Sequence, residues 1–279
     1  MEIEVSAADG HRFAVHWHPA CARGGPALLF LPALAVSASR YERFAQALNT
    51  QGVSVAVPDW RGLASSSLRP GRDHDWGYRD LLEVDLAATR AALAAHAPGE
   101  RWAIGGHSLG GQLAALAAAM APGDFVALVL VATGVPDARL FSGRNRWGVR
   151  LLAGAIPALT RLFGYFPGDR LRWAGREAAT LMRQWAGTVL TGDYSNVGIR
   201  DAEARLRALP LPMLGVRLSD DWLAGEASMR ALADKLGPGP RTFEVIDGAR
   251  LGDRPDHFRW LKSPAVPAAI IAGWLRINP

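Results

Sequence analysis

Short stretches in which nearly every residue is apolar recur along the chain and predict strands of a covered sheet. Strands buried on both faces lose the alternation of apolar and polar residues that half-exposed strands keep. Five stretches have this character: residues 27–31, 53–57, 102–104, 125–132 and 213–218. Residues 242–246, which include Thr242 and Glu244, are predicted as a sixth strand of this region. Together these strands predict the interior layer of an α/β protein.

The N-terminal residues show strict alternation instead. Residues 2–6 and 12–18 alternate apolar and polar side chains, and Asp9-Gly10 between them is a strong signal for a tight turn. We therefore predict a hairpin, which brings the number of strands to eight.

Segments with helical spacing separate most of these strands. Apolar or small residues recur at helical intervals in residues 41–48, 81–95, 109–121, 171–185, 227–236 and 265–275. Alternation of strand and helix implies a mostly parallel sheet with right-handed crossovers and helices on both faces. The predicted fold class is α/β, with a mostly parallel eight-stranded sheet.

This alternation stops after the sixth predicted strand and resumes after Pro210. The intervening residues hold several amphipathic stretches, the clearest being residues 171–185. We predict that residues 1–134 and 211–279 form one core domain. Residues 135–210 would form a helical cap inserted after strand 6.

Composition excludes several other classes of protein. The chain has 279 residues, of which 49% are hydrophobic and 20% charged, so it can bury a large core and is not a disordered chain. Pro122, Gly123 and Asp124 interrupt the longest apolar stretch, so no transmembrane segment is expected. The start, MEIEVSAADG, lacks the basic and then apolar order of a secretory signal. We expect a cytoplasmic globular protein.

The positive charge is concentrated in the predicted cap. The chain carries a net charge of +5, yet residues 135–210 alone contain 12 Arg against 6 Asp and Glu. A basic segment of this kind is usually a solvated helix face. It can also attract phosphates, anionic lipid or an acidic partner protein. We expect no nucleic-acid partner.

Neither cysteine nor histidine indicates a metal or cofactor. The single cysteine, Cys21, excludes an internal disulfide framework and a cysteine-based zinc site. His16 and His18 alternate along one predicted strand, but a third ligand at suitable spacing is missing. We therefore predict no metal and no cofactor.

The sequence GGHSLGG at residues 105–111 carries the clearest chemical signal. It contains G-x-S-x-G, follows a predicted strand and opens a predicted helix. This context is the one that a nucleophile elbow requires, in which a strained turn exposes the serine and glycines avoid clashes. The helix N-terminus behind Ser108 also favours a developing negative charge. We therefore predict that Ser108 is a nucleophile.

A serine nucleophile needs a base and an acid, and around a nucleophile elbow these follow in the order Ser, acid, His. His257 is the only histidine after Ser108. The acid is expected after the strand at residues 213–218, where Asp220 and Asp221 are neighbours. The alternative acids lie in the loop of His257 itself: Asp247, Asp253 and Asp256.

These motifs resemble the α/β-hydrolase superfamily, and the resemblance covers essentially the whole chain. Residues 59–65, DWRGLAS, are similar to the D-x-R-G-x-G-x-S stretch of that superfamily. Residues 158–168, ALTRLFGYFPG, resemble an uncharacterised bacterial branch of serine aminopeptidase-like hydrolases. In that pattern the catalytic acid precedes a proline or an apolar residue, which favours Asp221.

The resemblance also implies an oxyanion hole. Superfamily members usually carry His-Gly after the third strand, whereas this chain has Pro32-Ala33-Leu34. Because the donor is a backbone N–H group, Leu34 can still supply it, with the Leu109 N–H as the second donor.

The sequence thus predicts a serine hydrolase that cleaves a small ester or thioester with an apolar acyl group through an acyl-enzyme. The cap, with 8 of the 23 aromatic residues, would roof the site with its apolar faces, and its arginines would point largely outward. One alternative is a thioesterase acting on an acidic acyl carrier protein or acyl-CoA, which the arginine excess favours. Another is a catalytically weak ligand-binding protein of the same fold.

Overall fold

A single eight-stranded sheet runs through the molecule in the order β1-β2-β4-β3-β5-β6-β9-β10. The computed structural model describes residues 1–20, 24–171 and 173–278, so Cys21 lies outside the described part. The strands are β1 Glu2–Ser6, β2 Arg12–His18, β3 Ala27–Leu31, β4 Ser54–Pro58, β5 Trp102–His107, β6 Leu128–Val131, β9 Met213–Leu218 and β10 Arg241–Ile246. All pairs from β4 to β10 are parallel, whereas β2 is antiparallel to both β1 and β4. The predicted eight-stranded, mostly parallel sheet is confirmed.

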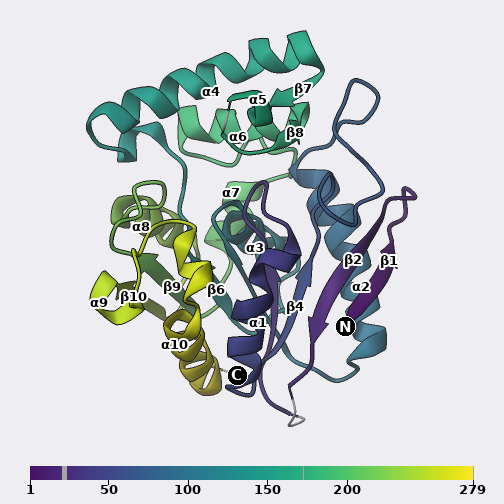
Figure 1. Cartoon of the computed structure of the whole chain (residues 1–279), viewed down its shortest axis with the longest axis vertical. Helices are drawn as coiled ribbons and strands as arrows, with labels where there is room; N and C mark the ends of the chain where they lie inside the picture. Colours follow the sequence, from purple (N-terminus) through teal and green to yellow (C-terminus); the bar gives the residue numbers. More distant parts are fainter. Residues whose placement is uncertain (21–23, 172, 279) are drawn as a thin grey trace.

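Helices cover both faces of the sheet, as predicted (Figure 1). On one face α1 and α10 pack against the strands, and on the other α2, α3 and α8 do so, with α7 packed on α3 and α8. Their bounds are α1 Glu42–Asn49, α2 Leu86–His96, α3 Leu109–Met120, α7 Ala202–Arg207, α8 Glu226–Lys235 and α10 Ala265–Ile277. Neighbouring residues of a buried strand serve opposite cores, as Leu28 and Leu29 of β3 do. This double burial explains why these strands are continuously apolar.

The N-terminal hairpin forms with Ser6 opposite Arg12. Its turn is longer than two residues, because the Ala7 N–H donates to the His11 carbonyl at 2.8 Å. Gly10 adopts a φ of +85° there, which glycine reaches without strain.

After β6 the chain builds a separate layer before it returns to β9. This layer contains η3 Ala138–Leu140, α4 Gly143–Phe163, β7 Tyr165–Pro167, α5 Gly168–Leu171, β8 Arg176–Ala178 and α6 Ala179–Thr191. It has its own apolar cluster, in which Ile156 of α4 and Met182 of α6 are fully buried. In Figure 1 it lies at one end of the sheet, with α4 outermost. The helix α7 that follows packs against α3 instead.

The predicted helix at residues 171–185 is wrong in its first half, whereas residues 179–185 are helical. α5 ends at Leu171, β8 pairs antiparallel with β7, and α6 begins only at Ala179. The pairing of β8 with β7 satisfies backbone groups of both strands, and this contact overrides the local amphipathic spacing. Arg172, within that predicted helix, lies outside the described residues.

The other short elements complete the core. The predicted helix at residues 81–95 begins with a π-helical segment, η2 Asp80–Asp85, and continues as α2. The remaining elements are η1 Ala38–Tyr41, α9 Gly248–Leu251 and η4 Arg259–Lys262. Among the described residues, no helix has the length and apolar character needed to cross a membrane.

Candidate active site

Ser108 lies at the sharp turn between β5 and α3. Its backbone has φ +55° and ψ −119°, a strained conformation for a residue with a side chain. A Cβ on Gly106 would lie 2.5 Å from the Gly110 carbonyl oxygen, and one on Gly110 would overlap the Leu31 carbonyl. The two glycines of the motif therefore allow the close backbone approach that the turn needs.

His257 and Asp221 meet beside this turn, although 36 positions separate them in the sequence. The His257 Nδ1 atom and the Asp221 Oδ2 atom are 2.8 Å apart, and both residues are buried. The other Asp221 oxygen accepts the backbone N–H groups of Leu223 and Ala224 at 2.9 and 3.0 Å. Because a carboxylate accepts, Nδ1 donates and Nε2 keeps its lone pair for a proton of the reacting group.

The other acids do not approach His257 in this way. Asp220 is exposed and accepts a hydrogen bond from the Ser219 hydroxyl. Asp247 accepts the Arg250 N–H at the start of α9. Asp253 and Asp256 likewise accept neighbouring backbone N–H groups. The three loop acids thus order the segment that carries His257.

Two residues that sequence reasoning did not single out hold the loop after β3. The Tyr41 hydroxyl accepts the Ala33 N–H at 2.9 Å and lies 2.9 Å from the His107 Nδ1 atom. The indole of Trp60 donates to the Pro32 carbonyl at 2.7 Å. No local signal marks such roles, because the partners lie up to 66 positions apart in the sequence.

His107, the buried neighbour of His257, is kept uncharged mainly by its burial. His107 is fully buried, and its ring centroid lies 4.9 Å from that of His257. Burial, with His257 as a second cause, lowers the pKa of His107 well below its usual value. A neutral His107 leaves His257 free to accept a proton without a second positive charge beside it.

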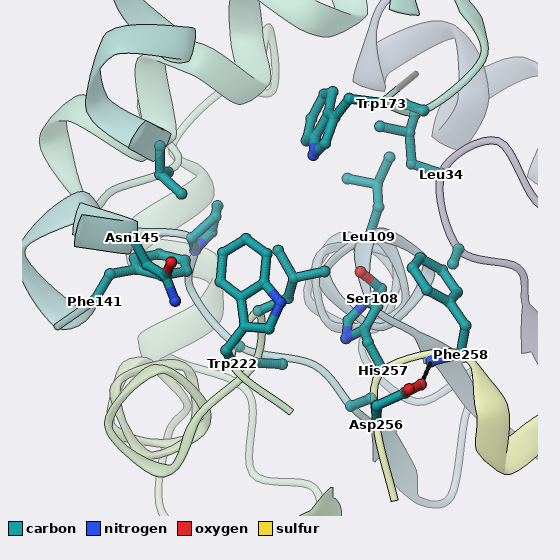
Figure 2. Close-up of a pocket in the computed structure, with 18 of the residues that line it drawn as sticks. Leu34, Ser108, Leu109, Phe141, Asn145, Trp173, Trp222, Asp256, His257 and Phe258 are labelled. Carbon is teal, nitrogen blue, oxygen red and sulfur yellow. Dashed lines mark hydrogen bonds between the residues drawn. The ribbon is translucent and has the colours of Figure 1, made fainter. Parts of the chain in front are cut away.

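A cavity of about 660 Å³ opens over Ser108 and His257. Leu34 and Leu109, the predicted oxyanion donors, line it beside Ser108. Figure 2 shows Trp173 and Phe258 above and beside the serine, with Trp222 and Phe141 across the hollow. Four of the five predicted site residues therefore line one largely apolar cavity. The fifth, Asp221, contacts His257 from behind this wall.

The predicted cap supplies one side of this cavity. Phe141, Trp173 and Trp185 line it, together with α4 residues such as Val149 and Leu152. Trp147 of α4 points away and is exposed, which differs from the expectation that apolar faces would turn to the cleft. All arginines described between residues 135 and 210 are exposed, although one of them, Arg144, also lines the cavity.

His16 and His18 face separate acids on the strand where they alternate. His16 Nε2 lies 3.7 Å from Asp59, and His18 Nε2 lies 3.3 Å from Glu42. In the described part of the chain no three histidine, cysteine or acidic side chains gather in a way that could hold a metal ion.

A serine on a strand–helix turn, in a sheet of this order and with a histidine–acid pair beside it, defines the α/β-hydrolase class. The chain belongs to the serine aminopeptidase S33 family, whose model matches residues 26–250. No curated protein matches the sequence significantly.

Solved structures share the fold at low sequence identity. The complex of DcsB with its substrate analogue aligns with a TM-score of 0.68 and 16% identity, covering 100% of this chain and 98% of that one. The monoacylglycerol lipase of Paleococcus ferrophilus gives 0.68 and 15%, covering 96% and 99%. A thermophilic esterase from Thermogutta terrifontis, with malate bound, gives 0.64 and 17%, covering 100% and 99%.

Proposed function

We propose that the protein is a serine hydrolase that cleaves carboxylic esters or thioesters with an apolar acyl group. The observation that carries this proposal is the 2.8 Å contact of His257 with Asp221 beside a strained Ser108, at the base of one cavity. Family membership and the esterase and lipase names of its structural neighbours support hydrolysis.

In the proposed reaction, the Ser108 oxygen attacks the substrate carbonyl carbon while His257 takes the hydroxyl proton. Asp221 holds the imidazole in the required tautomer and stabilises the imidazolium. The backbone N–H groups of Leu34 and Leu109 donate to the oxyanion. Leu109 is the first residue of α3, so its N–H has no acceptor within the helix.

His257 then gives its proton to the leaving alcohol or thiol, and an acyl-enzyme on Ser108 remains. A water molecule, deprotonated by His257, attacks this ester and releases the acid. Residues 135–210 act as the cap in this scheme, and α4 to α6 form its body. The apolar wall that the cap contributes excludes water and accepts the acyl chain.

A fluorophosphonate probe tests the proposal directly, because it reacts with an activated serine. We expect stoichiometric labelling that maps to Ser108 by mass spectrometry and disappears in the His257→Ala variant. Unlabelled Ser108 in folded protein would favour the alternative of a ligand-binding protein.

The geometry of the site does not distinguish esters from thioesters, because both present the same carbonyl group to Ser108. A panel of acyl p-nitrophenyl esters and acyl-CoA thioesters tests which of the two classes the protein hydrolyses. Comparable kcat/KM values for a CoA thioester and the matching ester would extend the activity to thioesters. A carrier protein that docks on the arginines would add a steep salt dependence, which neutral esters would not show.

A further inference from the structure

Helix α4, which is outermost in its layer (Figure 1), exposes a stripe of apolar residues. Trp147, Leu151 and Leu162 are 65%, 70% and 64% exposed. With Ala155 and Ala158 they recur at intervals of four, four, three and four, so they share one face of the helix. The stripe is therefore a continuous surface, and it has no packing partner among the described residues.

A row of arginines follows this stripe. Arg146, Arg150 and Arg161 each directly precede one of its three large apolar residues, so they lie together on one flank. The 21-residue helix contains no aspartate or glutamate. In the described structure none of the three arginines pairs with an acidic side chain, so their charges face outward.

The same helix reaches the active-site cavity with its other side. Val149 and Leu152 line the cavity, and Ile156 is buried in the cap. The outer stripe is thus not needed to hold the helix in place. Large exposed apolar surface with one sign of charge marks an interaction site.

We propose that the outer face of α4 binds the surface of an anionic lipid bilayer. A helix with tryptophan and leucine on one face and arginines beside them lies in the headgroup region, where apolar side chains enter the acyl boundary and guanidinium groups meet phosphates. The outermost position of α4 in Figure 1 leaves this face accessible to a flat, fluid surface. Charge alone would serve an acidic protein, but it would leave the apolar stripe unexplained.

Binding in this orientation would bring the cavity beside α4 close to the bilayer. Acyl esters that partition into membranes are then the substrate class favoured by this surface. This last step rests on the proposed hydrolase function, whereas the binding itself does not.

Flotation with phosphatidylcholine vesicles containing or lacking 30% phosphatidylglycerol tests the binding. We expect the protein to float with the anionic vesicles only. Leu151→Ser with Leu162→Ser should weaken partitioning by at least about tenfold. Arg150→Gln with Arg161→Gln should weaken it by about fivefold for each arginine.

Matched controls lie elsewhere on the surface. Ile277→Ser removes an apolar residue that is 77% exposed on α10, and Arg40→Gln with Arg43→Gln removes two exposed charges near α1. Both should bind vesicles like the unmodified protein. Brominated lipid should quench tryptophan fluorescence, and Trp147→Phe should remove most of the quenching.

All α4 variants should keep their turnover of a water-soluble p-nitrophenyl ester, which separates a failure of docking from a failure of the hydrolase proposal. Three results would overturn the membrane proposal. They are equal flotation with neutral vesicles, no flotation with either, and conversion of a dimer to a monomer by the leucine variant. The last would make α4 a contact between copies of this chain.

Discussion

Ser108 combines a strained backbone with a position at the base of the cavity, and this combination distinguishes a reactive serine from an ordinary turn residue. Folding does not need the strain, so the surrounding contacts must maintain it. Gly106 and Gly110 permit this conformation, because they leave room where the backbone segments meet.

Removing the nucleophile or the base should abolish most of the activity. Ser108→Ala and His257→Ala should each lower kcat by about 10⁴-fold or more, because the pair acts as one unit. The double variant should lose little more than either single one. Steady-state kinetics on a p-nitrophenyl ester, with circular dichroism as a check on folding, measures this. Near-normal turnover by Ser108→Ala would contradict the mechanism.

The two neighbouring acids should differ sharply. Asp221→Asn keeps the shape of the side chain but favours the wrong imidazole tautomer, and by analogy with a serine protease kcat should fall by about 10⁴-fold. Asp220→Asn is the matched control, and its side chain is exposed. It should retain most of the activity. A larger loss of activity in the Asp220 variant than in the Asp221 variant would contradict the assignment of Asp221 as the catalytic acid.

At this scale the sequence was informative where a residue type has few alternatives. A single histidine after Ser108 left one candidate base, and the motif glycines marked the turn. The choice between Asp220 and Asp221 needed the family pattern, because neighbouring loop positions look alike in sequence. Tyr41 and Trp60 were missed because their contacts with the loop after β3 depend on the folded chain.

Elements were predictable in proportion to how much their own sequence determines them. The strands buried on both faces were recovered within a few residues, since continuous burial requires continuous apolar character. The prediction of one continuous helix over residues 171–185 failed, because the same apolar spacing is also compatible with the observed strand β8 followed by helix α6. Only the pairing of β8 with β7 decides between them.

Strand β8 carries a buried acid whose titration should affect stability. Glu177 is almost fully buried, and burial raises its pKa from the usual 4.5 to about 8. Between these values the folded protein retains a proton that the unfolded chain has released, so the free energy of unfolding should fall as pH rises through this window.

Glu177→Gln should remove this dependence. We expect the variant to match the unmodified protein near pH 4 and to exceed its stability by about 5 kcal/mol at pH 9. Urea denaturation between these pH values measures the difference. Glu4→Gln, on the exposed side of β1, should show none. A constant difference across the range would mean that Glu177 does not titrate in this way.

For the whole molecule, the sequence predicted the order of strands and helices. It did not predict which side of the cap helix α4 faces the solvent. The chain order of strands and helices and the insertion after β6 follow from local patterns. The outward stripe of α4 could not be predicted, because its helix is apolar on both sides and only the packed structure shows which side is buried.

The size of the cavity should appear as a preference for acyl chains of moderate length. Each methylene group that enters the apolar cavity should contribute about 0.8 kcal/mol, or roughly fourfold in kcat/KM, until the cavity is full. A series of p-nitrophenyl esters from acetyl to dodecanoyl measures this. Equal kcat/KM across the series would show that the cavity does not bind the acyl chain.

Adjacent leucines on α4 provide a matched pair to locate the acyl chain. Leu152 lines the cavity, whereas Leu151, about 100° around the helix axis from it, is 70% exposed. Leu152→Phe should fill part of the cavity and shift the optimum to shorter chains, with little effect on acetyl ester turnover. Leu151→Phe makes the same chemical change outside and should leave the chain-length profile unaltered. An identical profile for both variants would place the acyl chain away from α4, so the cap would roof the site without selecting the substrate.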